Sequence, residues 1–313
     1  MTDLICGVDV SSTHLDACIR TMPDAVARFE NSSAGVSALA AFCRSHGVEL
    51  VVMEATGGYE RLAFGSLWAE GVRAAVVNAR SVRRFAEAMG FFEKTDRLDA
   101  HAIAWYAEVK RIVPHPPASG VQQTLTAVVT RLRQLTELRT MQSNQRRLVD
   151  NPDAITSFDE LLALVGRQIR GLEDRIIALI TSDPLWGELD GAFRSIKGVA
   201  GRTVARILAD MPEIGTLSNK AVAKLAGLAP LANDSGKQIG RRSVRGGRSS
   251  VRSILFVVAG VVAKHDPDFA AFHRKLTDAG KAKKAIRVAL ARKLLVRLNA
   301  KAREIRRGFP ELA

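Results

Sequence analysis

The first 110 residues alternate between short apolar runs of strand length and longer stretches whose apolar residues recur at helical spacing. We predict five strands, over residues 4–10, 15–20, 25–29, 48–53 and 72–77. Helices are predicted over 59–70, 81–89 and 95–110, and another begins at Ser33, taken as its N-cap, and ends at Gly47. Three strands therefore come first, and helices and strands alternate after them.

The element order indicates the architecture of this first domain. Three strands in a meander followed by alternating helices and strands is the order of the RNase H-like fold, which houses many polynucleotidyl transferases, an analogy at the level of the fold. A proline-rich segment at 114–117 then interrupts the pattern. We therefore expect an α/β, RNase H-like domain over residues 1–113.

Two long helical stretches follow, over about 122–149 and 157–181, and each carries an apolar stripe. The first stripe comprises Leu125, Val128, Val129, Leu132, Leu135 and Leu138, and the second comprises Leu161, Leu164, Ile169, Leu172 and Ile176. Paired stripes suit an antiparallel hairpin or an intermolecular coiled coil, although a helical linker packed on the body explains them equally well. We expect a helical coiled-coil region over 114–185 and a mainly helical domain over 186–313.

Charge narrows the range of partners. The 313 residues include 46 Lys and Arg against 32 Asp and Glu, and residues 237–307 alone hold 20 basic residues against 4 acidic ones. A net charge of +14 favours a polyanion, which means nucleic acid or an anionic membrane. The longest apolar run, 254–263, is about half of a membrane span, and the N-terminus lacks the features of a signal peptide. We expect a nucleic-acid partner and no membrane.

The cysteines bear on the compartment. Cys6, Cys18 and Cys43 have no metal-ligand spacing and cannot all pair. Reduced thiols in a cytosolic protein are favoured. The expected location is the bacterial cytoplasm, in association with the nucleoid.

Four acidic residues stand where this fold would bring them together. Asp9 lies inside the first predicted strand, where a carboxylate is costly unless it is paired or metal-bound. Glu54 ends the fourth predicted strand, which neighbours the first in an RNase H-like sheet. Asp96 and Asp99 lie three residues apart and share one face of the helix predicted over 95–110. Each acid alone has an ordinary structural interpretation. The set of four favours a site for Mg²⁺ or Mn²⁺, two of which can stabilise attacking and leaving oxygens in phosphoryl transfer.

The C-terminal domain has two candidate nucleic-acid-binding features. Residues 193–208 look like a helix-hairpin-helix whose turn amides hold a DNA phosphate, with Lys197 and Arg202 beside them, and a plain helical turn is the alternative. The second feature is a Gly-, Ser- and Arg-rich stretch after Pro230, dense enough in cations to neutralise several phosphates. Its basic residues are Lys237, Arg241, Arg242, Arg245, Arg248 and Arg252.

Ser235 stands in the same stretch, between Asp234 and Gly236. Serine is a poor nucleophile unless another group lowers the cost of deprotonation, and no histidine lies near it in the sequence. Composition alone therefore favours a turn residue. A metal or a carboxylate from the other domain would be needed to activate it.

Together these motifs carry a family resemblance. The spacing of Asp9, Glu54-Ala-Thr-Gly, Lys94-Thr-Asp96-x-x-Asp99, Ala226-Gly-Leu-Ala-Pro and Asp234-Ser235-Gly236 resembles that of the DEDD-type insertion-sequence transposases, a family of guide-RNA-directed serine recombinases. The resemblance covers about residues 4–300, and 246–252 and 281–294 also look like C-terminal blocks of the family. Any one motif is degenerate, whereas their combination is specific.

The resemblance implies a RuvC-like domain joined by a helical coiled coil to a Tnp domain. It implies that Asp9, Glu54, Asp96 and Asp99 bind Mg²⁺ and that Ser235 attacks DNA to form a phosphoserine linkage. A structured noncoding guide RNA (a bridge or seeker RNA) would pair with donor and target DNA. The protein would act as a homo-oligomer, a dimer that becomes a tetramer in the synaptic complex, with a composite active site drawn from two protomers.

Two other functions stay open. A metal-only nuclease, such as a Holliday-junction resolvase, would use water as the nucleophile and leave Ser235 a structural role. A non-catalytic protein with a degenerate RNase H-like domain would only bind structured nucleic acid. The intact set of four acids argues against this second alternative.

Overall fold

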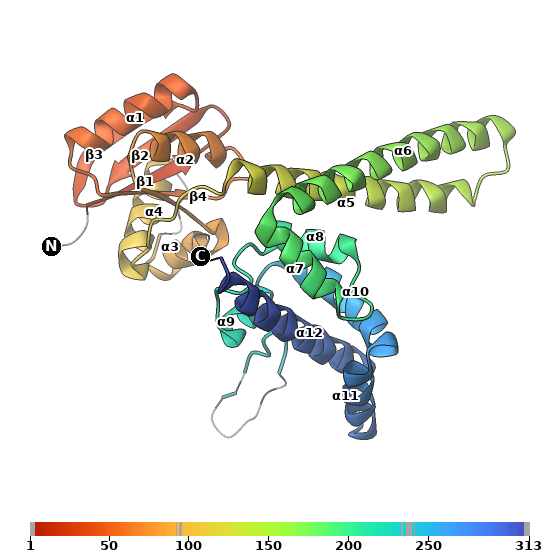
Figure 1. Cartoon of the computed structure of the whole chain (residues 1–313). Helices are drawn as coiled ribbons and strands as arrows, with labels where there is room; N and C mark the ends of the chain where they lie inside the picture. Colours follow the sequence, from red (N-terminus) through yellow and green to blue (C-terminus); the bar gives the residue numbers. More distant parts are fainter. Residues whose placement is uncertain are drawn as a thin grey trace. The chain divides into compact units, whose positions relative to one another are not determined.

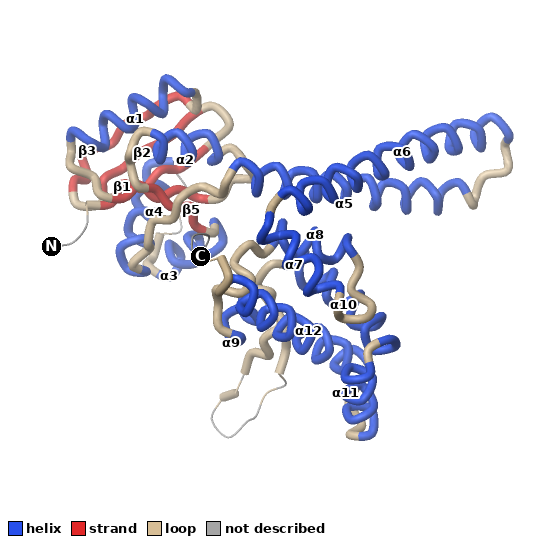
Figure 2. Tube along the Cα trace, viewed as in Figure 1, coloured by secondary structure: helices blue, strands red, loops and turns tan. Residues whose placement is uncertain are grey.

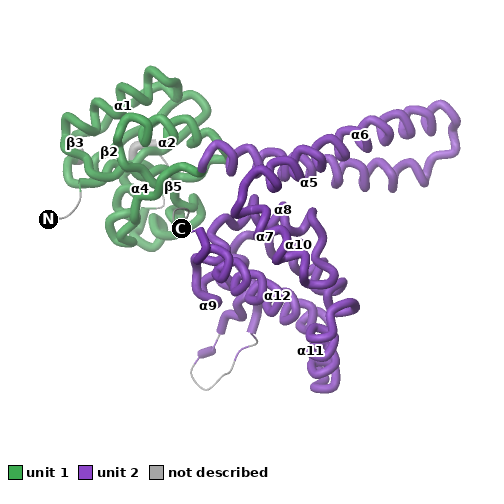
Figure 3. The backbone as a smooth tube through the Cα atoms, viewed as in Figure 1, with its two compact units in different colours: residues 1–118 green, residues 119–313 purple. Residues whose placement is uncertain are grey.

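The computed structural model describes residues 4–91, 93, 96–232, 234–235, 240 and 242–309, and leaves the side chains of Pro23, Asp96 and Arg97 undescribed. The chain divides into two compact units, unit 1 (Met1–Ala118) and unit 2 (Ser119–Ala313) (Figure 3). Unit 1 is α/β, and the regular elements described in unit 2 are helices (Figure 2).

Unit 1 is built on a five-stranded sheet. Its strands are β1 (Ile5–Val10), β2 (His14–Ile19), β3 (Met22–Glu30), β4 (Leu50–Glu54) and β5 (Ala74–Val77). They lie in the order β3-β2-β1-β4-β5 (Figure 1). The three N-terminal strands pair antiparallel, whereas β4 pairs parallel with both β1 and β5. The predicted strands and the mixed α/β class are confirmed, with strand ends shifted by up to three residues.

Each face of the sheet has its own core. The helices that cover the sheet are α1 (Ser33–Ser45), α2 (Glu60–Ala69), α3 (Ala79–Ala88) and α4 (Asp96–Lys110). Cys6, Val8 and Val10 of β1 pack on one face with buried residues of α1 and α2. Ile5 packs on the other face with α4. Because side chains alternate along a strand, Gly7 and Asp9 also belong to the α4 face.

Capping decides where two of these helices begin. Ser32, and not Ser33 as predicted, is the N-cap of α1, since its hydroxyl accepts the Gly35 N–H at 3.2 Å. Asn78 caps α3 in the same way, so α3 begins two residues before the predicted start. Gly47, at φ +68°, follows the end of α1 as expected.

α4 packs against β1 at Gly7. A Cβ atom at Gly7 would lie 2.1 Å from the carbonyl oxygen of Ala100 and 2.6 Å from the amide nitrogen of Ala104, so only glycine admits the helix at this depth. Further along α4, Glu108 forms a 3.2 Å ion pair with Arg20, which follows β2. α4 therefore runs antiparallel to β1, because Arg20 lies beside the first residue of that strand, Ile5.

The helical hairpin of unit 2 consists of α5 (Gly120–Arg146) and α6 (Pro152–Ser182), which lie side by side (Figure 1). The first predicted stripe is buried or partly buried throughout. In the second stripe, Ile169 and Ile176 are buried, but Leu161 and Leu164 are 36% and 44% exposed. These two leucines lie toward the end of the hairpin, beyond the rest of unit 2, so the hairpin alone does not cover the whole predicted stripe.

The remainder of unit 2 is helical, as predicted. Its helices are α7 (Pro184–Arg194), α8 (Gly201–Asp210), α9 (Asn219–Leu225), α10 (Ser249–His265), α11 (Pro267–Asp278) and α12 (Lys283–Arg306). One apolar core extends from the hairpin through these helices. Within it, the buried amide of Asn299 accepts the Gly215 N–H at 2.9 Å. None of the described helices is long and apolar enough to cross a membrane.

Candidate functional site

Two of the four predicted acids stand next to each other on the sheet. β1 and β4 are parallel, and their last registered pair is Val8 opposite Met53. Asp9 and Glu54 each come one residue later, so they are level with each other and point to the α4 face. Both are half-buried at the ends of their strands. Asp9 and Glu54 are therefore neighbours on the sheet, as predicted.

α4 brings the other two acids toward the same strand ends. Its backbone contacts β1 at Gly7, and its N-terminal turns extend from there toward Asp9 because the two elements are antiparallel. From Gly7 to Asp9 is about 7 Å of strand, and from Ala100 back to Asp96 is about 6 Å of helix. Asp99 is half-buried on this turn, and the Asp96 side chain lies outside the described residues.

The sheet adds an acid that the sequence analysis did not single out. Asp16 of β2 is directly opposite Asp9 in the antiparallel register, so the two carboxylates share the α4 face. On the far side, Arg28 of β3 donates to both oxygens of Asp16, at 2.8 and 3.1 Å. Arg28 thus neutralises Asp16 and leaves Asp9 beside a paired rather than a bare carboxylate.

A second unforeseen residue, Glu60, organises the segment that follows Glu54. Its Oε2 accepts the Thr56 N–H at 3.1 Å, the Gly58 N–H at 2.9 Å and the Thr56 hydroxyl at 3.3 Å. Burial raises the pKa of Glu60, but these hydrogen bonds outweigh burial and lower the pKa below its usual value. The sequence shows that Glu60 follows Glu54 by six residues, but it does not show the hydrogen bonds from Thr56 and Gly58 to Glu60.

The acids fit a hard divalent cation by donor type. Asp9, Glu54 and Asp99 offer only carboxylate oxygens, the ligands that Mg²⁺ and Mn²⁺ prefer. Among the described side chains, no group of three His, Cys, Asp or Glu residues is close enough to hold a metal ion. That description does not extend to the Asp96 side chain, which stands on the same helical turn.

Ser235 is exposed in the loop between α9 and α10 of unit 2. Its neighbour Asp234 forms an ion pair with Arg242 at 2.6 Å and accepts the Gly240 N–H at 3.0 Å. Leu231 and Ser243 form an antiparallel bridge that joins the two sides of the loop. Asp234 therefore uses its carboxylate to bind other residues of the loop, and it does not act as a base for Ser235 in this arrangement.

The predicted nucleic-acid-binding cations fall into two groups. Arg248 donates to both carboxylate oxygens of Glu213 at 2.6 and 2.5 Å, Arg252 donates to the Gly246 carbonyl at 2.5 Å, and Arg202 pairs with Glu173. Each of these guanidinium groups therefore already contacts a partner within unit 2. Lys197 and Arg245 are exposed, whereas Lys237 and Arg241 lie outside the described residues.

The turn between α7 and α8 is held by glycine. Gly198 has φ +97°, and a Cβ atom there would lie 3.0 Å from the Val262 amide nitrogen of α10. Val199 is buried, while Gly201 and Arg202, at the first turn of α8, are exposed. The two helices and their short turn are present as predicted, and phosphate binding by the turn stays a prediction.

Comparison with known proteins gives the class and then the family. A family model described as Transposase (DEDD_Tnp_IS110) matches residues 6–149, and one described as Transposase IS116/IS110/IS902 family matches residues 190–274. The two matches cover both units, so the class is that of transposases. The chain belongs to the IS110 family of transposases, which confirms the expected membership of the insertion-sequence transposases, while the serine nucleophile and the guide RNA stay predictions.

Two curated relatives extend over nearly the full chain. They are the pilin gene-inverting proteins of Moraxella lacunata, 28% identical over 309 residues, and of Moraxella bovis, 28% identical over 311 residues. In each case the alignment covers 94% of this chain and 94% of the relative. Among solved structures, a Thermus thermophilus RuvC structure aligns with 36% of this chain and 99% of its own, at 16% identity and a TM-score of 0.26.

Proposed function

We propose that this transposase cleaves and rejoins DNA strands with Ser235 as the nucleophile and with the carboxylates of Asp9, Glu54, Asp96 and Asp99 as its metal-binding set. The observation that carries the proposal is the placement of Asp9 and Glu54 at adjacent ends of parallel strands, under the N-terminal turns of α4. An RNase H-like, RuvC-like domain is the fold that this sheet order supports best.

The carboxylate set would hold Mg²⁺, or Mn²⁺, which when bound neutralises charge on a phosphate and helps to deprotonate an attacking hydroxyl. Asp9 and Glu54 supply oxygens from rigid strands, and α4 supplies the rest from its first turns. Arg28 keeps Asp16, the neighbour of Asp9 on β2, in an ion pair. Glu60 fixes the loop after Glu54 through three hydrogen bonds.

Ser235 supplies the attacking oxygen. A bond forms between its Oγ and a backbone phosphorus, one P–O bond of the DNA breaks, and the serine ester keeps the bond energy of the phosphodiester. The hydroxyl of another strand then attacks the same phosphorus, which releases the serine and joins the strands. No high-energy cofactor is consumed, because each broken ester bond is replaced by another. The exposed position of Ser235 suits attack on a macromolecule.

The basic loop and the α7–α8 turn would position nucleic acid. Lys197, Arg242 and Arg245 are exposed cations on these segments, and Lys237 and Arg241 belong to the same loop sequence. In this proposal the turn acts as a helix-hairpin-helix that grips a phosphate, and a structured guide RNA supplies the sequence information by pairing with donor and target DNA. The reaction would take place in the bacterial cytoplasm.

The hairpin supports the proposed homo-oligomer. Met141 and Leu148 near the end of α5 are 48% and 86% exposed, and Leu161 and Leu164 are exposed on α6. Apolar side chains gathered away from the core favour contact with another protomer. We propose functional regions over 1–113, 114–185 and 186–313, with the middle one providing the contact between protomers in a dimer and, in the synaptic complex, a tetramer.

The test is a covalent protein–DNA adduct. The full chain is incubated with Mg²⁺, end-labelled DNA of the element's ends and RNA transcribed from the DNA that flanks the coding region, and then separated on a denaturing gel. The wild type gives an adduct, Ser235→Ala loses it by about 10³-fold or more, and Ser249→Ala, at the exposed start of α10, keeps it. Asp9→Asn and Glu54→Gln lose the adduct, whereas Glu49→Gln, at the opposite end of β4, keeps it.

Two outcomes would favour the alternatives. Strand exchange that survives Ser235→Ala but not Asp9→Asn would indicate a metal-only nuclease. Absence of any Mg²⁺-dependent cleavage by the wild type with its RNA would indicate a non-catalytic nucleic-acid-binding protein.

A further inference from the structure

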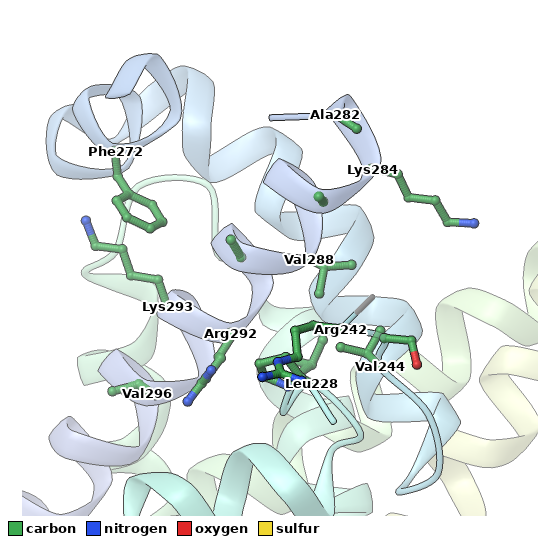
Figure 4. Close-up of a pocket in the computed structure, with 14 residues that line it drawn as sticks. Leu228, Arg242, Val244, Phe272, Ala282, Lys284, Val288, Arg292, Lys293 and Val296 are labelled. Carbon is green, nitrogen blue, oxygen red and sulfur yellow. The ribbon is translucent and has the colours of Figure 1, made fainter. Parts of the chain in front are cut away.

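A pocket of about 840 Å³ opens on unit 2 beside the loop that carries Ser235 (Figure 4). One wall is a single face of α12, since its lining residues recur at three- and four-residue steps. These residues are Ala285, Val288, Ala289, Arg292, Lys293 and Val296. The other wall comes from Leu228, Pro230 and residues 242–244, and Phe272 of α11 adds an aromatic ring.

The lining combines an apolar floor with cations. Leu228, Val288 and Val296 are among the apolar side chains that form the floor. The cations are Arg242, Lys284, Arg292 and Lys293, and none of the described lining residues is acidic. A cavity of this size that pairs an apolar floor with a few charged groups is typical of a small-ligand or nucleotide site.

Three of the four cations form no ion pair with a described residue, and two of them, Arg292 and Lys284, are held by no other contact among the described residues. Lys293 donates to the Asp268 carbonyl at 3.1 Å and lies 4.6 Å from the centre of the Phe272 ring, so its position is fixed. Arg242 is paired with Asp234. Arg292 and Lys284 form no ion pair with any residue that the structure describes. The pocket is therefore set up for an anion that also has an apolar part.

The pocket is tied to the candidate nucleophile. Arg242 lines the pocket and holds Asp234, the residue before Ser235. The bridge between Leu231 and Ser243 joins the two loop arms where they leave the pocket wall. Ser235 is the fourth residue after Leu231, so their Cα atoms are at most about 14 Å apart. A strand attacked by Ser235 passes within a few nucleotides of the pocket.

We propose that this pocket receives one unstacked nucleotide of the single DNA strand on which Ser235 acts, with the base on the apolar floor and the adjoining phosphate on Arg292 and Lys284. The proposal rests on the proposed function, since it takes the position of Ser235 as the point of attack. An apolar floor contributes to binding any base without reading its sequence, because every base has an apolar face. Unstacking one nucleotide beside the nucleophile exposes its phosphate to in-line attack.

The charge of the lining selects nucleic acid over a protein segment. An apolar helix from a second copy would leave Arg292 and Lys284 unpaired in the contact, which is costly. DNA is chosen over RNA because the pocket adjoins the serine loop. RNA and a second protein chain are the competing occupants in the experiment below.

The experiment measures binding of the full chain, without divalent ions, to a short single-stranded oligothymidylate that carries one 2-aminopurine, and to the same strand with an abasic site in that position. Arg292→Ala removes a cation from the pocket, and Ala289→Leu fills the floor without changing charge. We expect each to weaken binding of the intact strand roughly tenfold. Ala289→Leu should leave the abasic strand unaffected and abolish the change in 2-aminopurine fluorescence on binding.

Two matched variants serve as controls. Arg274→Ala removes an exposed cation of α11, and Ala300→Leu enlarges an exposed residue of α12, both outside the pocket. Both should bind the strand like the wild type. Circular dichroism verifies folding, and Arg292→Ala decides the question if Ala289→Leu does not fold.

Three results would overturn the proposal: pocket variants that bind the DNA strand like the controls, a loss confined to an RNA strand of the same sequence, or a changed sedimentation coefficient with unchanged DNA binding. The adduct assay separates this proposal from the proposed function. Ser235→Ala should lose the adduct but bind the strand normally. Normal adduct formation by Ser235→Ala, together with weakened strand binding by Arg292→Ala, would remove the serine mechanism and leave a nucleotide pocket.

Discussion

At the scale of single residues, Glu60 links local structure to the candidate site. Its carboxylate gathers two backbone N–H groups and one hydroxyl from the loop that follows Glu54. Because these donors favour the charged form, the pKa of Glu60 in the folded protein is below its value in the unfolded chain. Charge on Glu60 therefore stabilises both the fold and the position of the strand end that carries Glu54.

We predict a pH-dependent loss of stability in Glu60→Gln. A lowered folded-state pKa stabilises the protein above the unfolded pKa of about 4.3, and that contribution disappears as pH falls through the still lower folded pKa. At pH 7 the variant should lose about 1 kcal/mol of unfolding free energy. Below about pH 4 the two proteins should converge. Urea unfolding at pH 7 and below about pH 4 measures the difference, and Glu49→Gln, exposed directly before β4, should show no such dependence on pH.

Single residues also show where sequence reasoning reaches its limit. The sequence could predict that Asp9 and Glu54 lie close together, because the element order implies that their strands are neighbours. The sequence could not predict that Asp16 lies opposite Asp9 and pairs with Arg28, because cross-strand pairs depend on the register of the strands. Register is fixed by turns and packing rather than by the residues alone. Cations such as Arg248 look alike in sequence whether they bind phosphate or, as here, a carboxylate of the same unit.

At the scale of elements, the close packing of α4 against β1 determines where Asp99 lies. The contact at Gly7 brings the helix backbone against the strand, which no side chain larger than hydrogen permits. The aromatic rings of Phe85 and Trp105, 5.5 Å apart and edge to face, then join α3 to α4. A glycine in a predicted strand interior often marks such a close approach, and this signal was present in the sequence.

We predict that Gly7→Ala displaces α4 and disrupts the carboxylate site. The added methyl group collides with backbone atoms of α4, which cannot rotate away, so the unfolding free energy should fall by about 1–3 kcal/mol and the covalent adduct should be lost. Gly65→Ala in α2 is the control, because its Cβ would meet no atom within 4 Å and should slightly stabilise the helix. Thermal unfolding and the adduct assay would contradict the prediction if the two variants behaved alike.

The same scale explains which element predictions failed. Strand and helix identities followed from periodicity, whereas the start of α1 depended on which of two adjacent serines turns its hydroxyl to the Gly35 amide. The sequence predicts the stripe of α6 but leaves open whether the other helix, a second chain or the body of the protein covers it. Periodicity reports which side chains share a face, but not whether a partner covers that face along the whole helix, and Leu161 and Leu164 are left exposed.

At the scale of the whole molecule, charge is divided between the units. Residues 1–118 contain 12 Lys and Arg against 14 Asp and Glu, whereas residues 119–313 contain 34 against 18. The acidic side chains proposed to hold metal belong to the nearly neutral unit, and the proposed nucleophile belongs to the basic one. In the proposed function, unit 2 would therefore provide the attraction for nucleic acid, and the two units would contribute different parts of the chemistry. If the acids and the nucleophile are divided in this way, each reaction needs both units. In an oligomer, the two units that act together can come from different protomers.

Assembly through the hairpin is the remaining prediction. Leu161 and Leu164 lie three residues apart on α6 and are exposed, so replacing both with Glu should leave the monomer folded while placing charge in any contact made by that face. If the wild type dimerises through this face, as proposed, we expect the double variant to sediment as a monomer at the same concentration, and to lose strand exchange while retaining the binding of single-stranded DNA. Val257→Glu, which changes a 61% exposed residue of α10, is the matched control and should remain dimeric. A double variant that stays dimeric would assign the contact between protomers to another surface, and the exposed leucines would then mark only the uncovered end of a helical hairpin.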